Sequence, residues 1–289
     1  MSVQSLSVVV PNKRCVNNCA FCVSRMHCDQ SKNQMDDNKP FYDLYLKDYL
    51  KRLAYCKEKG IDTIMLTGDS EPQQNRNFLT YFGLFMQLME QPFRKIEMQT
   101  TGVLIDRNYL RFLRNHVGVN TIALSLSSFD SDLNMWYNGT PREFRVDIPW
   151  LCSQIKEYDF NLRLCVNMTD GYDWQDIDGI FHMTHYLGAD QMTFRVLYTS
   201  DEDTPQSRWI KEHGAPPEVK DAVEQYVKKH GKPIDVLPYG AIKYSVDGIS
   251  TVIDSDCMNK AGREDNKYYI LRPDCHLYSQ WDDPASLIF

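Results

Sequence analysis

The sequence predicts an α/β protein: a partial (β/α)6 TIM-type barrel with a C-terminal extension of short strands and a helix. Two observations support this fold class. Short apolar runs alternate with longer helical patterns over residues 1–198, an order typical of βαβ units with a parallel sheet. Six units in that length average about 33 residues each. A complete eight-unit barrel averages about 31 residues per unit, so the unit length suits a barrel, and six units in place of eight indicate an incomplete one.

The predicted elements follow one another regularly. Strands are expected at residues 6–10, 62–66, 95–100, 120–127, 161–167 and 191–198. Helices are expected at residues 41–60, 77–89, 106–117, 145–158 and 172–188. The first of these helices ends at Gly60, a residue type that favours a helix C-terminus. We therefore assign residues 1–198 to the barrel.

The pattern changes after residue 198. A polar, proline-containing stretch leads to an expected helix at residues 217–230, and short strands and turns are expected from residue 234 onward. We interpret residues 199–289 as a C-terminal extension packed on the barrel.

Each expected strand has an apolar side and a polar side, because side chains on a strand point alternately to opposite faces. The polar sides carry Glu97 and Gln99, then Ser125 and Ser127, then Arg163, Cys165 and Asn167, and finally Thr193 and Arg195. If helices cover the apolar sides, the polar sides face the lumen. Ordinary TIM-barrel lumens are filled with bulky branched residues, so this pattern indicates a ligand chamber. A bulge that reverses the alternation is the alternative.

The bulk composition excludes several classes of protein. Acidic residues outnumber basic ones, 39 to 32, for a net charge of −7. This charge disfavours nucleic acid as a partner, because phosphate binding requires clustered cations. No apolar stretch approaches the about 20 residues that span a bilayer, and the N-terminus lacks the features of a signal peptide. We expect a cytoplasmic protein, whose thiols stay reduced.

The cysteines point to a metal centre. Cys15, Cys19 and Cys22 form C-x3-C-x2-C after the first expected strand, and Cys28 is the one nearby fourth thiol. A zinc site usually has four ligands in two short-spaced pairs. Three close thiolates suit a [4Fe–4S] cluster with one iron lacking a protein ligand. The odd total of nine cysteines fits a disulfide framework poorly.

Two motifs resemble the radical S-adenosylmethionine (radical SAM) superfamily. "CVNNCAFC" matches the cysteine signature of that family, including the aromatic Phe21 before the last cysteine. "TGDSEP", at residues 67–72, resembles the Gly-Gly-Glu-Pro segment that holds the amino group of S-adenosyl-L-methionine. Glu71 and Pro72 stand where the family has them, next to Gly68, whereas Asp69 and Ser70 replace the usual glycines.

The resemblance implies cofactors and a reaction. Cys15, Cys19 and Cys22 hold the [4Fe–4S] cluster, S-adenosyl-L-methionine binds its open iron, and reductive cleavage yields a radical that removes a hydrogen atom from substrate. Weaker matches extend the cofactor site to Thr101 in "QTTG", to Ser125 or Ser127, and to Asn167. The electron comes from a donor such as flavodoxin or ferredoxin. The family resemblance covers about two-thirds of the chain and leaves the tail unassigned.

Other residues are candidates for the substrate. Arg163 and Arg195 lie on the polar sides of neighbouring strands and can form a clamp for a carboxylate or phosphate. In the alternative, Glu97 neutralises one of them. In the tail, Cys257 or Cys275 is a candidate hydrogen-atom donor, and the alternative is a pair of structural cysteines. Two thiols cannot provide the usual four ligands of a second cluster.

The sequence thus predicts a radical SAM enzyme acting on an anionic small-molecule or nucleotide-like substrate. The first expected strand begins at residue 6, which leaves no room for an N-terminal leader-binding domain. An enzyme that modifies ribosomal peptides, such as an epimerase using a tail cysteine, is the alternative. A non-catalytic iron–sulfur or zinc-binding protein is the alternative from another class.

Overall fold

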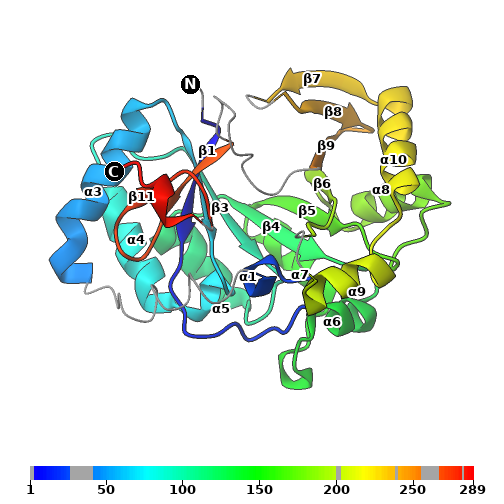
Figure 1. Cartoon of the computed structure of the whole chain (residues 1–289), viewed down its shortest axis with the longest axis horizontal. Helices are drawn as coiled ribbons and strands as arrows, with labels where there is room; N and C mark the ends of the chain where they lie inside the picture. Colours follow the sequence, from blue (N-terminus) through cyan, green and yellow to red (C-terminus); the bar gives the residue numbers. More distant parts are fainter. Residues whose placement is uncertain (1–2, 27–41, 200–202, 238–239, 255–266, 282) are drawn as a thin grey trace.

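The structure is a computed structural model that describes residues 3–26, 42–199, 203–237, 240–254, 267–281 and 283–289. Cys28 and Cys257 lie outside these ranges, so the structure does not describe the fourth thiol near the cysteine motif or the first of the two candidate hydrogen-atom donors. The described strands form one sheet in the order β11-β10-β1-β2-β3-β4-β5-β6-β9-β8-β7. Helices surround this sheet (Figure 1).

The six predicted strands form the centre of the sheet. They are β1 (Ser5–Val9), β2 (Thr63–Thr67), β3 (Lys95–Thr100), β4 (Thr121–Leu126), β5 (Asn161–Asn167) and β6 (Gln191–Arg195). Each pairs in parallel with the next. The prediction of an α/β fold with a partial parallel barrel is confirmed, and the sheet is not closed.

The C-terminal segment extends both edges of this sheet. Its strands are β7 (Lys232–Val236), β8 (Ile242–Val246), β9 (Ile249–Asp254), β10 (Tyr268–Leu271) and β11 (Leu277–Tyr278). β9 pairs in parallel with β6, and β10 pairs in parallel with β1. Lys267 donates to both carboxylate oxygens of Asp254, at 2.8 and 2.9 Å. This ion pair links β9 to β10, the strands that the C-terminal segment adds beside β6 and β1.

Helices cover the outside of the sheet, as Figure 1 shows. They are α3 (Tyr42–Glu58), α4 (Arg76–Leu88), α5 (Arg107–Phe112) with a π-helical turn (Leu113–Val117), α6 (Ser131–Asn138), α7 (Ile148–Glu157), α8 (Ile177–Tyr186) and α10 (Pro217–His230). Two further helices, α1 (Val23–Met26) and α9 (Pro205–His213), lie at the carboxyl ends of the strands. Short 3-10 turns occur at Pro72–Gln74, Arg142–Phe144 and Pro284–Ser286. Side-chain caps begin several helices: Asp106 accepts from the amide of Tyr109, and Asp147 from that of Trp150, an arrangement that stabilises the first turn.

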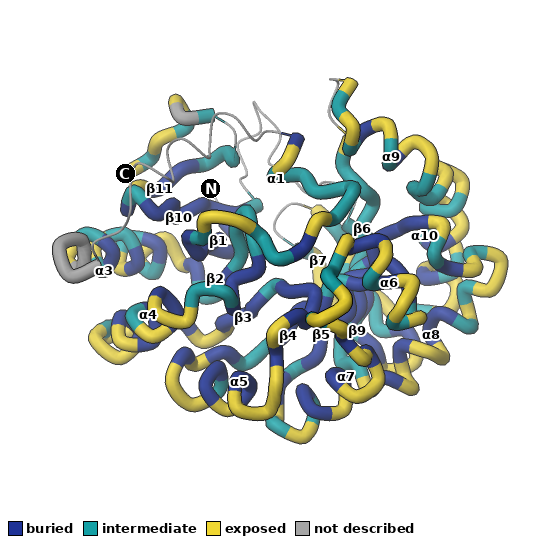
Figure 2. Tube along the Cα trace, turned by 90° about the horizontal axis from the view of Figure 1, so that it is seen from below, coloured by how far each residue is buried: buried dark blue, intermediate teal, exposed yellow. Residues whose placement is uncertain are grey.

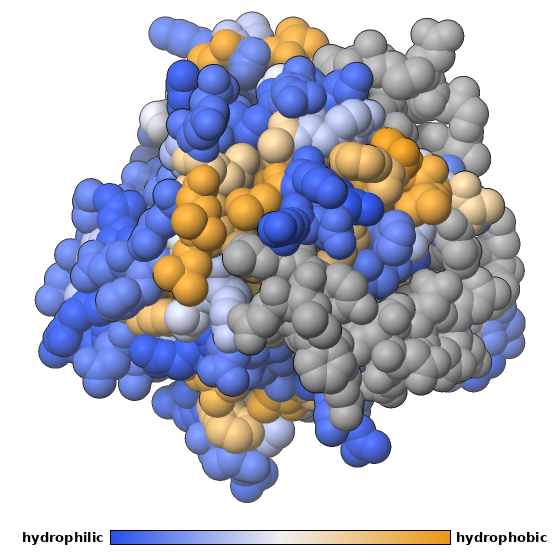
Figure 3. Space-filling view, turned by 90° about the vertical axis from the view of Figure 1, so that its left-hand side faces the viewer, coloured by the Kyte–Doolittle hydropathy of each residue, from blue (hydrophilic) through white to orange (hydrophobic). Residues whose placement is uncertain are grey.

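The hydrophobic core lies between the sheet and the helices. Ile122, Leu124 and Leu126 of β4 are fully buried and pack in one large cluster with the helices, so the predicted direction of the apolar side is confirmed for this strand. Figure 2, seen from below, looks onto the carboxyl ends of the strands and shows buried strands inside largely exposed helices. Among the described residues on the face in Figure 3, most are hydrophilic, and the hydrophobic ones gather in patches. Among the described helices, none has both the length and the hydropathy needed to cross a membrane.

Candidate active site

The loop that follows β1 carries Cys15, Cys19 and Cys22, and Asn17 holds it from within. The Asn17 side chain is 2% exposed. Its Nδ2 donates to Glu71 Oε1 at 3.1 Å and to Thr101 Oγ1 at 2.8 Å, while its Oδ1 accepts from Thr140 Oγ1 at 2.9 Å. One asparagine inside the cysteine motif thus ties the loop to the ends of β2, β3 and α6.

Glu71 is the centre of this buried network. Its Oε1 accepts from Asn17, from the Thr101 amide at 3.1 Å and from the Thr101 hydroxyl at 2.7 Å. Its Oε2 accepts from Gln73 Nε2 at 2.6 Å and from Thr100 Oγ1 at 2.7 Å. A carboxylate offers about four lone-pair sites, so protein donors already occupy them. Direct binding of an amino group by Glu71 stays a prediction, and it requires one of these donors to leave.

The Cys15 and Cys19 thiols lie close enough to Cys22 and Glu71 for these charges to act on their pKa values. Burial raises the pKa of Cys15, and the negative charge of Glu71 raises it further. Burial raises the pKa of Cys19 well above its usual value, and Cys22, Glu71 and Cys15 add to the effect. Among the described residues, no three His, Cys, Asp or Glu side chains converge around a single-ion position. A positively charged iron centre would offset the cost of three nearby thiolates, and the all-thiolate donor set suits an iron–sulfur cluster.

An aromatic group from the C-terminal segment covers the cysteine loop. Trp209 of α9 lies 5.6 Å from Phe21 and 5.7 Å from Tyr137, between ring centroids. The ring of His213, one turn later, packs against Trp209 with 4.7 Å between ring centroids, and its Nδ1 lies 3.0 Å from Asp170 Oδ2. Phe21 therefore packs under a helix from the tail. Its contact with a cofactor stays a prediction.

The loop after β2 packs tightly against β1. Gly68 has φ +153°, and a Cβ there would lie 3.1 Å from the Val10 carbonyl oxygen, so a larger residue would push the loop away. Ser70 Oγ is buried and has no hydrogen-bond partner among the described residues. Such a hydroxyl is free to bind a polar group of a ligand. Pro72 begins the short helical turn that carries Gln73 into the Glu71 network.

The predicted contacts on β4 and β5 meet in the structure. Asn167 Nδ2 donates to Ser125 Oγ and to Ser127 Oγ, both at 3.1 Å. Asn167 and Ser127 are buried at 2% and 0% exposure. The three side chains form one polar group at the carboxyl ends of their strands, and their role in binding a cofactor stays a prediction.

A cavity of about 400 Å³ occupies the lumen. Its lining includes Gly68, Asp69, Gln99, Arg163, Cys165, Thr193 and Arg195. The prediction that the polar sides of the strands face a chamber is confirmed for the last five of these. The cavity has the size of a small-molecule site.

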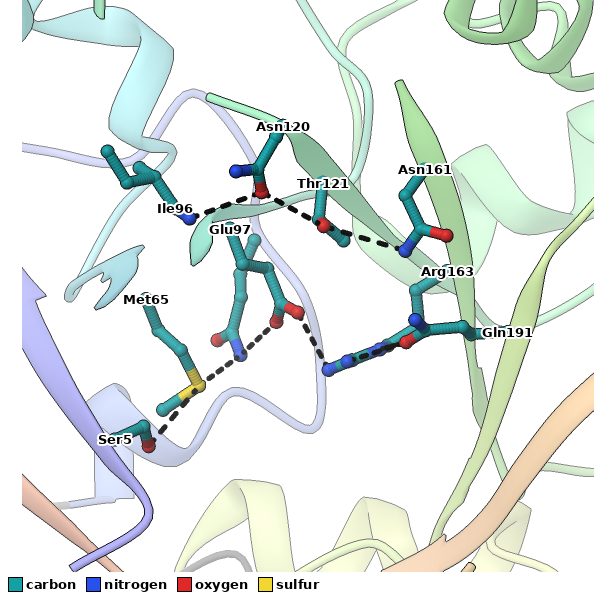
Figure 4. Close-up of polar contacts among 10 residues, drawn as sticks. Ser5, Met65, Ile96, Glu97, Asn120, Thr121, Asn161, Arg163 and Gln191 are labelled. Atoms are coloured by element: carbon teal, nitrogen blue, oxygen red, sulfur yellow. Dashed lines mark hydrogen bonds and ion pairs between the residues drawn. The ribbon is translucent and has the colours of Figure 1, made fainter. Parts of the chain in front are cut away.

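The floor of the cavity is held by Arg163 and Glu97 (Figure 4). Arg163 Nη1 lies 2.7 Å from Glu97 Oε2, and its Nε and Nη2 donate to Gln191 Oε1 at 2.9 and 2.7 Å. The Glu97 side chain is 5% exposed. The alternative in which Glu97 neutralises one arginine is thus the observed arrangement.

The predicted clamp of two arginines loses the support of Arg163, whose guanidinium is already engaged by Glu97 and Gln191. Arg163 is paired in register with Gln191, and Arg195 is paired with Asn167, four residues further along the strands. Four residues of strand correspond to about 13 Å. Arg163 binds Glu97 and Gln191 at the floor of the cavity, whereas Arg195 lies at the carboxyl end of β6, beside Asn167. Arg195 remains the candidate for binding an anion.

The tail cysteine that the structure describes lies away from the cavity. Cys275 is 2% exposed and belongs to the core cluster with Tyr49 of α3. Burial raises its pKa to about 12. The preceding Arg272, Pro273 and Asp274 line the cavity, but Cys275 does not. This placement argues against Cys275 as a hydrogen-atom donor, because the strand end turns its thiol toward α3.

Several site residues escaped the sequence reasoning. Asn17, Gln73 and Thr100 complete the Glu71 network, and Trp209 covers the cysteine loop. A signal existed for the first three, since each lies within or beside a recognised motif. No sequence signal pointed to Trp209, because it lies in the polar, proline-containing stretch to which no helix was assigned.

Comparison with known proteins agrees with this geometry. A comparison with curated proteins finds no match. Among solved structures, Streptococcus suis SuiB bound to S-adenosylmethionine is similar over 96% of this chain and 58% of its own, with 14% identity and a TM-score of 0.56. This chain thus spans less than two thirds of the SuiB chain.

Other solved structures share the fold. Native anSMEcpe with bound AdoMet and Cp18Cys peptide is similar over 97% of this chain and 74% of its own, at 12% identity and a TM-score of 0.61. Coproporphyrinogen III oxidase (HemN) from Escherichia coli is similar over 81% and 55%, at 13% identity and a TM-score of 0.50. The model of the Radical SAM superfamily matches residues 9–183, more than half of the sequence, and the chain therefore belongs to that superfamily.

Proposed function

We propose that this protein holds a [4Fe–4S] cluster on Cys15, Cys19 and Cys22, binds S-adenosyl-L-methionine beside it, and acts on an anionic small-molecule or nucleotide-like substrate in the cavity. When bound, these two cofactors supply a carbon radical that removes a hydrogen atom from the substrate. The protein supplies position and a site shielded from water.

One observation carries the proposal: the buried network of Asn17, Glu71 and Thr101. It joins the cysteine loop to the loops after β2 and β3 through hydrogen bonds of 2.7–3.1 Å. Loops at the carboxyl ends of parallel strands are where α/β barrels build active sites. Here the network sets three such loops in a fixed relation beside the cavity.

In this proposal S-adenosyl-L-methionine is held by two groups of residues. One is Gly68, Asp69, Ser70 and Pro72, and the other is Asn167 with Ser125 and Ser127. Gly68 and Asp69 line the cavity, and Ser70 offers an unused hydroxyl. Glu71 contributes mainly by holding this segment, since both of its oxygens accept bonds from the protein.

The substrate part of the proposal depends on Arg195. This residue lines the cavity and is the register partner of Asn167, so an anion bound by its guanidinium would lie next to the proposed cofactor group. Arg–carboxylate and Arg–phosphate pairs are among the stronger polar contacts. The peptide-modifying alternative loses the support of Cys275, which faces the core.

The first test is anaerobic reconstitution with iron and sulfide, followed by dithionite and S-adenosyl-L-methionine. We expect 5′-deoxyadenosine from the wild type and none from Cys22→Ala. One zinc per chain without sulfide would contradict the cluster and favour a structural metal protein. A cluster that neither binds nor cleaves S-adenosyl-L-methionine would favour a non-catalytic iron–sulfur protein.

The second test concerns substrate class. A panel of carboxylate- and phosphate-bearing metabolites is screened for compounds that raise 5′-deoxyadenosine formation. Arg195→Ala should weaken the response to such a compound and leave the affinity for S-adenosyl-L-methionine unchanged. Equal loss of both would assign Arg195 a structural role, and stimulation by peptides alone would favour the peptide-modifying alternative.

A further inference from the structure

One side of the cavity is apolar and aromatic. Val9 of β1, Met65 of β2, Tyr268 of β10 and Trp281 all line the cavity and pack in one hydrophobic cluster. Among the described residues, Tyr268 and Trp281 are the two aromatic side chains in this lining. Their ring centroids lie 6.2 Å apart at an interplanar angle of 62°, an edge-on arrangement. We call these four residues the aromatic wall.

The aromatic wall is held in place from behind. Tyr268 is buried and is the register partner of Ser5 in β1. The buried Arg272 donates from Nη2 to the Gln280 carbonyl at 3.1 Å and to the Trp281 carbonyl at 2.6 Å. A guanidinium that binds two successive carbonyls fixes the backbone that carries Trp281. The indole ring is therefore preorganised at the edge of the cavity, which lowers the cost of binding a ligand there.

The opposite side of the cavity is polar. In the sheet, β3 and β4 lie between β2 and β5, and Figures 1 and 2 both show β1 and β6 on different sides of these two strands. Because a barrel-type sheet curves around its lumen, such strands face one another across it. Apart from Met192, the lining residues from β5 and β6 carry a guanidinium, thiol, amide or hydroxyl group: Arg163, Cys165, Gln191, Thr193 and Arg195.

We propose that the substrate is a planar aromatic ring bearing an anionic group, with the ring on the aromatic wall and the anion toward Arg195. The inference rests on the proposed function and narrows it, because it selects ring-bearing acids over sugar phosphates and aliphatic acids. Aromatic rings attract one another when their centroids lie about 4.5–7 Å apart, and a methionine sulfur favours the edge of a ring. A saturated ring gains only the burial of its surface. Met65, Tyr268 and Trp281 thus determine specificity and take no part in the chemistry.

Binding is measured by ligand-observed NMR titration of the purified protein, first without cofactors and then with cluster and saturating S-adenosyl-L-methionine. The matched pair is 4-phenylbutyrate and 4-cyclohexylbutyrate, which share the carboxylate and the chain and differ in the aromaticity of the ring. We expect 4-phenylbutyrate to bind about fivefold more tightly. The uncharged 4-phenylbutyramide should bind about tenfold more weakly than the acid. 3-Phenylpropyl phosphate identifies the anion: tighter binding than that of the acid assigns phosphate, and weaker binding assigns carboxylate.

Variants separate the two ends of the cavity. Trp281→Leu keeps an apolar side chain and removes the indole, so the affinity for 4-phenylbutyrate should fall about fivefold while that for 4-cyclohexylbutyrate stays nearly the same. Arg195→Met should remove the preference for the acid over the amide and keep the preference for the phenyl ring. The matched control is Trp150→Leu, an exposed position on α7 outside the cavity lining, where neither affinity should change.

Several results would overturn the proposal. Equal affinity of the wild type for the phenyl and cyclohexyl acids would do so without any variant, since the wall would then act only through its area. A phenyl preference that survives Trp281→Leu would place the ring elsewhere. Loss of 4-phenylbutyrate binding when S-adenosyl-L-methionine is added would assign the aromatic wall to the cofactor. Absence of 5′-deoxyadenosine formation would refute the proposed function, whereas the titrations need no turnover and would still decide what the aromatic wall binds.

Discussion

Replacing Glu71 by Gln tests whether the buried network holds the site together. The two side chains have the same shape, so the change removes the negative charge and turns one oxygen into an NH2 group. Whichever oxygen is replaced, at least two donors then face another donor. On the Oε2 side these are Gln73 Nε2 at 2.6 Å and Thr100 Oγ1 at 2.7 Å.

The expected cost follows from these contacts. Hydrogen bonds to a charged group contribute about 1.5–3 kcal/mol each, and two are lost at a site that is 6% exposed. We expect the free energy of unfolding of the metal-free protein to fall by about 4 kcal/mol. For a chain of this size, each kcal/mol corresponds to about 2–4 °C in Tm, so Tm should fall by about 10 °C.

The assay is thermal unfolding followed by circular dichroism under anaerobic conditions, without cofactors. The matched control is Glu90→Gln, an exposed position where we expect a change within about 0.5 kcal/mol. A fall in Tm of less than about 2 °C for Glu71→Gln would refute the reasoning. It would show that water, and not the protein donors, satisfies the carboxylate in solution.

Three further predictions address other parts of the molecule. Arg163→Met should destabilise the protein by about 3 kcal/mol because it leaves Glu97 buried without its partner, and Arg163→Met/Glu97→Gln should recover most of that loss in a denaturant double-mutant cycle. Trp209→Ala should speed the loss of cluster absorbance in air several-fold, because it uncovers the cysteine loop; an unchanged rate would show that α9 gives no protection. Burial raises the pKa of the Cys152 thiol to about 12. The neutral thiol therefore stabilises the fold fully at pH values below the thiol pKa of the unfolded chain, about 8.5, and this stabilisation is lost as pH rises toward 12. Between pH 7 and pH 10 the metal-free wild type should therefore lose about 2 kcal/mol more than Cys152→Ala, and parallel pH profiles would contradict this.

Much of the barrel could be predicted because its signals are local. The expected strands at residues 95–100 and 161–167 coincide with β3 and β5, and the expected tail helix coincides with α10. Alternation of polar and apolar residues identified the lumen side, since a strand cannot reverse its faces without a bulge. α1, α6 and α9 were missed, because each is too short for a helical period to stand out from the neighbouring sequence.

The tail shows where local reasoning ends. Its strands were expected, but not their partners: β9 joins β6, and β10 joins β1, on opposite edges of the sheet. Pairing of this kind depends on which edges the rest of the fold leaves open. The same holds for Trp209, whose contact with Phe21 joins residues 188 positions apart in the chain.

The sequence by itself determined the family chemistry of this protein, because the cysteine spacing and the Glu71-Pro72 segment each lie within one loop. It also determined which residue types face the lumen. The tertiary structure alone decided that Arg163 pairs with Glu97 while Arg195 lies beside Asn167 at the carboxyl end of β6, and that Cys275 turns toward α3. These outcomes depend on strand register and on side chains from distant segments, and a buried charge must pair with whatever group the fold brings within reach.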